Sequence, residues 1–181
     1  MGEESFSSAG VTVLDFWRWA LGDLRMNNAR GYLAEFIVAR AVGSTDPIRI
    51  EWGAHDVLAP DGTRIEVKSS GLLQSWGQAK LSTPRFSLTG AKETWDAETG
   101  EYIEDAAGRV DAWVFALHGC RDHEQYDPLD LGQWAFWAAS NQQVESWQRK
   151  SIGVTALERA LGEPAQFDEL AQIIPRRSTA Q

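Results

Sequence analysis

Residues 55–68 read HDVLAPDGTRIEVK, and the turn Pro60-Asp61-Gly62 in their middle predicts a β-hairpin. Proline presets the backbone angle of the first turn position, aspartate tolerates the second, and glycine supplies the left-handed residue that follows. This order suits a three-residue loop in which a type I turn is closed by a glycine bulge. The stretch therefore predicts two antiparallel strands, over 56–59 and 64–69.

The register of this hairpin decides where its charged side chains lie. Asp56 precedes the central turn residue by five positions and Glu66 follows it by five, so we expect the two carboxylates directly opposite each other. Cross-strand neighbours share one face, with Cβ atoms roughly 4.5–5.5 Å apart. Lys68, two residues beyond Glu66, points to the same face. A two-residue loop would instead pair Asp56 with Val67 and separate the acids.

Two carboxylates held this close repel each other unless one takes up a proton or both bind a cation. Mg²⁺ prefers oxygen ligands, keeps several waters and accepts the phosphate oxygens of a substrate. It also lowers the pKa of bound water and polarises a phosphoryl group. A neighbouring lysine can position the attacking water or stabilise the charge that develops in the transition state. The hairpin thus predicts a Mg²⁺ or Mn²⁺ site suited to phosphodiester hydrolysis.

Asp56, followed by Glu66-Val67-Lys68 on the next strand, resembles the motif of the PD-(D/E)xK, or restriction-endonuclease-like, superfamily. Glu35, on the preceding predicted helix, matches the helix glutamate found in many members. His55 stands where the motif nominally has proline. The resemblance spans roughly residues 31–117 and implies an α/β fold with a mixed central sheet flanked by helices.

The resemblance also implies a role for each matching residue. Asp56 and Glu66 would bind the metal, with the carbonyl of Val67 as a further ligand. Lys68 would act on the nucleophilic water. Glu35 would complete the metal shell directly or through a water molecule. The implied activity is hydrolysis of nucleic acid, with DNA as the expected substrate, in restriction, defence or repair.

The rest of the chain predicts further elements of a single mixed α/β domain over 1–181. Apolar spacing and capping-box pairs at Thr12/Asp15 and Thr155/Glu158 predict the helix starts, and Gly43 is a helix stop. We expect a buried helix stripe of Leu33, Phe36, Ile37 and Ala41. The predicted segments are N-terminal helices within 12–42 (the second over 29–42), a hairpin and sheet within 48–139 with strands at 48–52, 85–88, 111–117 and 134–139, a loop excursion over 92–108, C-terminal helices within 155–174, and a disordered tail over 175–181.

Composition bounds the class of protein. The chain has 181 residues, 43% of them hydrophobic and 24% charged, which suits one globular domain. It contains no run of about 18 apolar residues, so we expect no membrane span. The acidic start, residues 1–5, does not resemble a signal peptide. Cys120 is the only cysteine, which excludes an internal disulfide, and a cytoplasmic location is expected.

The charge of the chain counts against nucleic-acid binding without excluding it. The net charge is −9, whereas proteins that grip nucleic acid usually present basic surface. The charge is uneven, however: residues 49–92 hold six basic and four acidic residues, and residues 93–105 hold six acidic residues and no basic one. A bound divalent cation would change the field at the site further.

Several other polar residues are candidates for contacts with ligands. Three polar residues follow the predicted strand that contains Lys68 and could contact a nucleic-acid strand: Lys80, Arg85 and Gln78. An ordinary edge strand with solvated charges explains them as well. His118, Cys120 and His123 have irregular spacing and no fourth partner, so a polar loop is favoured over a zinc site. Glu35 could also be a solvated residue of an amphipathic helix rather than part of a metal site.

Two rival functions stay open from the sequence. A non-catalytic member of the same fold could bind nucleic acid or a protein partner, and the acidic charge favours it slightly. A carboxylate-pair glycoside hydrolase is supported only by the nine tryptophans. These tryptophans fill a core by default, as we expect for Trp134 and Trp137, but they could also build a homodimer contact.

Overall fold

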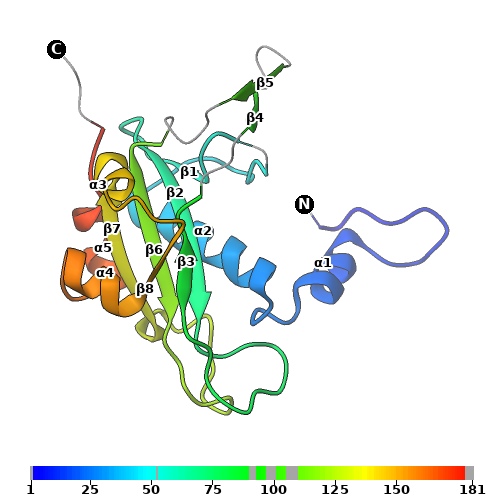
Figure 1. Cartoon of the computed structure of the whole chain (residues 1–181). Helices are drawn as coiled ribbons and strands as arrows, with labels where there is room; N and C mark the ends of the chain where they lie inside the picture. The colour runs from blue at the N-terminus through cyan, green and yellow to red at the C-terminus, as the bar shows by residue number, and fades with distance from the viewer. Residues whose placement is uncertain (1, 52, 90–92, 97–100, 105–109, 178–181) are drawn as a thin grey trace.

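A four-stranded mixed sheet forms the centre of the computed structural model, which describes residues 2–51, 53–89, 93–96, 101–104 and 110–177. In chain order its strands are β1 (Val57–Leu58), β2 (Arg64–Gly71), β6 (Ala112–His118) and β7 (Trp134–Ser140). They lie side by side in that order, and only the central pair, β2 and β6, is parallel (Figure 1).

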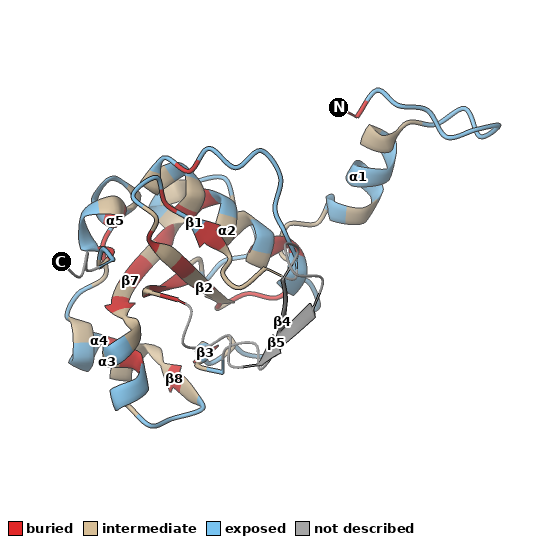
Figure 2. Cartoon of the chain, turned by 90° about the horizontal axis from the view of Figure 1, so that it is seen from above, coloured by how far each residue is buried: buried red, intermediate tan, exposed pale blue. Residues whose placement is uncertain are grey.

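Each face of the sheet is covered by a layer of its own, as Figure 2 shows from above. One layer consists of helices α2 (Asn27–Val42) and α5 (Phe167–Ile173). The other consists of the strand pair β3 (Arg85–Ser87) and β8 (Ser151–Gly153) with helices α3 (Asn141–Ser146) and α4 (Val154–Leu161). We call the two sides the α2 face and the β3 face. The predicted mixed sheet flanked by helices is therefore confirmed.

Four short elements lie outside these layers. Helix α1 (Val13–Leu21) stands away from the sheet and buries none of its side chains (Figures 1 and 2). The strands β4 (Glu93–Asp96) and β5 (Glu101–Glu104) pair with each other, and a 3₁₀ turn, η2 (Leu131–Gln133), precedes β7. Among the described residues, every helix is too short or too polar to cross a lipid bilayer.

Strand β6 supplies the core on both faces because all of its side chains are buried. Its small residues, Ala112, Val114 and Ala116, pack toward α2 and α5, in the same cluster as Ile37 and Leu170. Its large residues pack on the opposite side, in the cluster that contains Phe86, Val144 and Leu157. Strand alternation explains this division, and the prediction of a strand buried on both faces is confirmed.

Phe115, at the centre of β6, gives the first testable prediction. Its ring is fully buried and meets Phe86 edge-on at 5.5 Å and Trp147 at 6.2 Å between centroids. Phe115→Ala should lower the free energy of unfolding by about 3–5 kcal/mol, since it leaves a cavity in a rigid cluster. Denaturant titration measures this loss, with Leu129→Ala as an exposed control. A loss no larger than that of the control would contradict the packing described.

The segment after α2 is not the strand that its alternating sequence predicts. Residues 48–51 form an irregular loop, and Trp52 lies outside the described residues. Ile48 and Ile50 are 62% and 75% exposed, so no core exists for the alternating apolar side chains to enter. Period-two alternation becomes a strand only where the segment pairs with a neighbouring strand, and residues 48–51 pair with none of the strands described.

Helix α2 begins two residues before the predicted start at Ala29, since the amide of Arg30 already donates to the Met26 carbonyl at 2.8 Å. Its predicted buried stripe is wrong in part. Ile37 is buried, but Leu33 and Ala41 are only half-buried, and Phe36 is 57% exposed. Ala34 and Val38 lie in the core instead, because small side chains allow the helix to approach the sheet closely.

The two predicted capping boxes have different outcomes. Thr12 and Asp15 form the reciprocal hydrogen bonds of a capping box at the start of α1, as predicted. The box predicted from Thr155 and Glu158 is wrong, because α4 begins directly where β8 ends and Gly153 is its N-cap. The stop at Gly43 is confirmed by its left-handed backbone, with φ of 73°.

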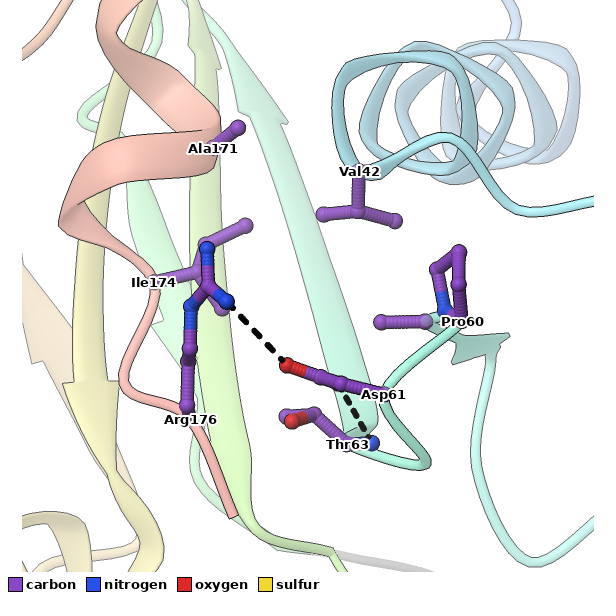
Figure 3. Close-up of a pocket in the computed structure, with 8 residues that line it drawn as sticks. Val42, Pro60, Asp61, Thr63, Ala171, Ile174 and Arg176 are labelled. Atoms are coloured by element: carbon purple, nitrogen blue, oxygen red, sulfur yellow. Dashed lines mark hydrogen bonds and ion pairs between the residues drawn. The ribbon is translucent and has the colours of Figure 1, made fainter.

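The C-terminal tail contacts the hairpin in its first residues. The amide of Arg177 donates to Thr63 Oγ1 at 3.0 Å, so the predicted disorder is wrong for residues 175–177, and residues 178–181 lie outside the description. A small cavity of about 160 Å³ lies between this tail and the turn, and Arg176 approaches Asp61 to 3.9 Å. Figure 3 shows the residues that line this cavity. The predicted excursion over 92–108 is described only at β4 and β5.

Candidate active site

The turn Pro60-Asp61-Gly62 has the predicted three-residue form. The amide of Gly62 donates to the Ala59 carbonyl at 2.9 Å, and the amide of Ala59 donates to the Thr63 carbonyl at 2.9 Å. Gly62 has φ of 82°, which side chains rarely adopt, so the glycine is required at this position. Asp61 Oδ1 accepts from the Thr63 amide at 3.0 Å and stabilises the loop further.

The hairpin register agrees with the one predicted from the turn. Val57 pairs with Ile65, which leaves Asp56 and Glu66 as the next cross-strand neighbours. The amide of Asp56 donates to the Ile65 carbonyl at 3.0 Å, so the backbone pairing continues to this position. The structure therefore brings together the two acids on which the sequence argument depends.

Asp56 lies immediately before the first residue of β1, the edge strand of the sheet. Its Oδ2 accepts a hydrogen bond from the Val67 amide at 2.8 Å. If β1 were longer, a backbone carbonyl of that strand would accept from this amide instead. In a strand, the backbone carbonyls of alternate residues point toward the same neighbouring strand. The Ile65 carbonyl points toward the β1 side of β2, so the Val67 carbonyl points to the same side. The side chain of Asp56 and the carbonyl of Val67 thus share one open edge of the sheet.

Glu66 and Lys68 project together from the β3 face of β2. Glu66 Oε1 accepts from Lys68 Nζ in a close ion pair, and the ammonium group lies 5.7 Å from the ring centroid of Trp113. The two side chains are only 14% and 23% exposed, respectively, so both charges are largely removed from water. An ion pair this sheltered holds the lysine beside the acids rather than in open solvent.

Glu35 reaches the same region from α2 and carries a partner that the sequence analysis did not identify. Its Oε1 accepts from Arg49 Nη2 at 3.2 Å, and Arg49 Nε makes a second contact with Oε2. The guanidinium of Arg49 stacks over the ring of Tyr32, with 4.7 Å from its central carbon to the ring centroid. The only signal in the sequence was a lone cation between Ile48 and Ile50.

The pKa values of Glu66 and Glu35 are raised because both acids lie in a sheltered site. Burial raises the pKa of Glu66, and the charge of Asp56 raises it further, while Lys68 opposes both effects. Burial also raises the pKa of Glu35, against the hydrogen bond from Arg49, and the charges of Asp56 and Glu66 contribute in the same direction. Carboxyl groups whose charge is disfavoured in this way are typical of functional sites.

The raised pKa of Glu66 predicts how the free energy of unfolding depends on pH. The folded protein holds a proton on Glu66 more tightly than the unfolded chain does. Stability is therefore lost as pH rises from the ordinary value of 4.5 through the raised folded value. Glu66→Gln cannot ionise, so the metal-free variant should gain stability relative to wild type as pH rises above the ordinary value of 4.5. Denaturant titrations in EDTA measure this difference, and a difference that is constant with pH would contradict the assignment.

The donor set suits a hard divalent cation, although each acid also has a partner within the protein. The described residues make no hydrogen bond to Asp56 Oδ1 or Glu66 Oε2, so one oxygen of each carboxylate can accept a cation. Those residues contain no group of three or more His, Cys, Asp or Glu arranged around a metal position, since Glu35 is turned toward Arg49. Two carboxylates and the Val67 carbonyl nevertheless fit Mg²⁺ or Mn²⁺.

A cavity of about 630 Å³ opens beside these acids. Asp56 and Glu35 line one part of it, and the side chains of Tyr32, Phe36 and Arg49 line another. Tyr32 and Phe36 are 37% and 57% exposed, and the guanidinium groups of Arg49 and Arg40 each cover one face of their rings. The volume lies within the range of roughly 300–1,000 Å³ that is typical of small-ligand pockets.

The residues predicted as nucleic-acid contacts lie apart from the carboxylates. Gln78 stabilises the loop after β2, where its Oε1 accepts from the Gln74 amide at 2.8 Å and its Nε2 donates to Ser82 Oγ at 3.0 Å. Lys80 is exposed on the same loop. Arg85 lies on β3 and donates to Ser151 Oγ at 2.8 Å. The structure therefore joins Arg85 to β8. It does not join Arg85 to Asp56, Glu66 and Lys68, which we call the hairpin site.

The weak zinc candidate finds no support in the described part of the chain. His118 is fully buried, with its ring 4.3 Å from that of Tyr126 and 5.1 Å from that of Trp134. Cys120 donates instead to the carbonyl of Asp122 at 3.3 Å.

Asp56, Glu35 and Arg49 line the cavity at the edge of the sheet, whereas Glu66 and Lys68 lie beside Asp56 on the β3 face and do not line it. Acids whose pKa values are raised, with a lysine held beside them, are typical of functional sites. Comparison with known proteins adds nothing further, since no family model, no curated protein and no solved structure matches the chain.

Proposed function

We propose that this protein is a metal-dependent nuclease that hydrolyses phosphodiester bonds of nucleic acid, with DNA as the expected substrate. The observation that carries the proposal is the hairpin register, in which Asp56 opposes Glu66 and Lys68 shares the face of Glu66. An exposed structural strand has no need for two acids opposite each other at the cost of a raised pKa. The resemblance to restriction-endonuclease-like proteins points to the same chemistry.

Three groups would hold the cation in this proposal: the carboxylates of Asp56 and Glu66 and the carbonyl of Val67. The cation would activate a bound water and polarise the phosphoryl group. Binding at Glu66 would compete for the carboxylate that now accepts from Lys68. The ammonium would then be free to donate to the attacking water or to a phosphate oxygen, where negative charge develops in the transition state.

The Glu35–Arg49 pair would complete the site from the α2 side. Arginine presents a planar fork of donors that matches phosphate oxygens, so Arg49 can exchange one contact with Glu35 for one with the substrate. Glu35 would then be free to hold a water of the metal shell. The rings of Tyr32 and Phe36 in the adjoining cavity can stack on a base that has left its duplex stack.

Cleavage assays test this proposal directly. Supercoiled plasmid, linear duplex, single-stranded DNA and RNA are each incubated with the full chain in Mg²⁺ or Mn²⁺, and in EDTA as the metal-free control. We expect metal-dependent cutting of at least one DNA substrate and none in EDTA. Absence of cutting in all four substrates with both metals would overturn the nuclease assignment.

A non-catalytic nucleic-acid- or protein-binding member of the same fold is the second candidate. The specific observation in its favour is that Glu35 and Glu66 already have cationic partners, Arg49 and Lys68. Isothermal titration with Mg²⁺ or Mn²⁺ separates the two candidates. A nuclease should bind the metal and lose that binding in Asp56→Ala, whereas a pure binding module should give no metal-binding heat in either protein.

A further inference from the structure

A second cavity, of about 410 Å³, lies where β3, β8 and α4 meet. Three arginines line it: Arg85 from β3, Arg149 from the turn before β8, and Arg159 from α4. Its other lining residues carry no charge, and no Asp or Glu is among them. In a chain whose net charge is −9, a cavity lined by three cations and no acid is a distinct electrostatic feature. We call it the arginine cavity.

The three guanidinium groups are available to a ligand. All three arginines are exposed, and none of them forms an ion pair with an acid in the part of the chain that the structure describes. Arg85 is held in position by Ser151 Oγ, which accepts from its Nη2 at 2.8 Å and from its Nε at 3.3 Å. Like charges gathered without a counter-charge favour an anion, and a guanidinium fork matches a phosphate group.

The neighbouring backbone and hydroxyl groups add donors to those of the arginines. Gly153 is the N-cap of α4 and provides no side-chain cap, so the first amides of the helix keep their donors for a ligand. Thr155, in the first turn of α4, also lines the cavity and carries a hydroxyl. These groups strengthen an anion site that the arginines define.

The arginine cavity and the hairpin site lie on the same side of the sheet. Phe86, the neighbour of Arg85 on β3, packs in the same cluster as Trp113. Lys68 lies over the ring of that tryptophan, and its strand contacts β3. Successive residues of a strand point to opposite sides, so Phe86 faces the sheet while Arg85 faces outward from the β3–β8 layer, and a polyanion that meets both the lysine and the arginines has to pass around the edge of this layer.

We propose that the arginine cavity binds phosphate groups of a nucleic-acid backbone and so fixes the strand relative to the hairpin site. The identity of the polyanion rests on the proposed function, whereas the anion site itself rests on the three arginines. A volume of 410 Å³ is many times the roughly 30 Å³ that one water occupies in the liquid, so there is room for more than a single phosphate group. Two or more phosphate groups in a row occur in nucleic-acid backbones and in pyrophosphate, and the proposed function favours the nucleic acid.

Salt-dependent binding of oligonucleotides tests this proposal. The full chain with Lys68→Ala serves as a background in which cleavage does not consume the probe, and fluorescent duplex DNA, single-stranded DNA and RNA are the probes. Arg149→Gln and Arg159→Gln should each lower the slope of log K against log salt by about one, and the double variant by about two. Arg121→Gln, an exposed arginine outside the cavity, is the matched control and should leave the slope unchanged.

The outcomes separate this inference from the nuclease proposal. The inference would be overturned if the double variant kept its affinity and salt slope, or lost no more affinity than Arg121→Gln does. This holds even if wild type cuts DNA. Arginine-dependent binding by a wild-type protein that cuts nothing would support the inference and remove the nuclease. Pyrophosphate that binds in an arginine-dependent way, with no nucleic acid bound, would also overturn it. Thermal unfolding of every variant verifies that it is folded. Arg149→Lys keeps the positive charge, so its slope of log K against log salt should lie closer to the wild-type value than that of Arg149→Gln.

Discussion

Replacing Lys68 with alanine should slow cleavage of the preferred substrate by about 10²–10³-fold, the usual cost of removing one preorganised donor from a transition state. Lys68 Nζ is held beside Glu66 and is largely shielded from water, where its charge is worth more than in open solvent. In the proposed mechanism, its loss would remove the donor to the attacking water or to a phosphate oxygen. Single-turnover cleavage with saturating Mg²⁺ measures the chemical step without product release.

Two further variants make this result specific. Lys80→Ala removes an exposed lysine from the loop after β2 and should keep most of the activity. Lys68→Arg keeps the charge but changes its shape and reach, so we expect only partial activity. Full activity in Lys68→Ala, with the metal still bound, would show that the lysine takes no part in the reaction.

Adding Mg²⁺ or Mn²⁺ should raise the melting temperature of wild type, and Asp56→Ala should abolish this rise. A ligand present at 100 times its dissociation constant stabilises the folded state by about 2.7 kcal/mol. For a chain of this size, that free energy corresponds to roughly 5–10 °C. Asp56 contributes because it faces Glu66 at the end of β1, where its charge raises the pKa of its neighbour. Scanning calorimetry or dye-based melting measures the shift.

Glu163→Ala is the matched control for this measurement, since Glu163 is exposed in the loop after α4 and lies outside the hairpin site. It should keep the full shift with metal. Asp56→Ala loses the hydrogen bond from the Val67 amide, so its metal-free melting temperature is compared with its own value in metal rather than with wild type. A shift of wild-type size in Asp56→Ala would contradict Asp56 as a ligand.

Local chemistry made the hairpin predictable from the sequence. Proline, aspartate and glycine at 60–62 each favour one backbone conformation, and together they fix the turn and the register. Register then fixes which side chains share a face, so the opposition of Asp56 and Glu66 follows without knowledge of the remaining fold. Strand β6 was predictable for a different reason, since a continuous apolar run has to be buried on both faces.

Contacts between distant segments were not predictable in the same way. Arg49 pairs with Glu35 only because the loop after α2 folds back over that helix, and alternation alone predicted a strand there. Arg85 meets Gly153 across the β3–β8 pair, and strands of three residues leave almost no pattern in the sequence. The arginine cavity depends on that pairing, which is why only Arg85 among its three cations was a sequence candidate.

We propose that Asp56, Glu66 and the Val67 carbonyl together hold a divalent cation beside Lys68. Crystals of the protein soaked in Mn²⁺, with diffraction data collected at the manganese absorption edge, locate the ion itself. We expect an anomalous peak between the two carboxylates, near the Val67 carbonyl, with Lys68 released from Glu66. Manganese bound elsewhere, or a hairpin with no peak at a saturating Mn²⁺ concentration, would contradict it.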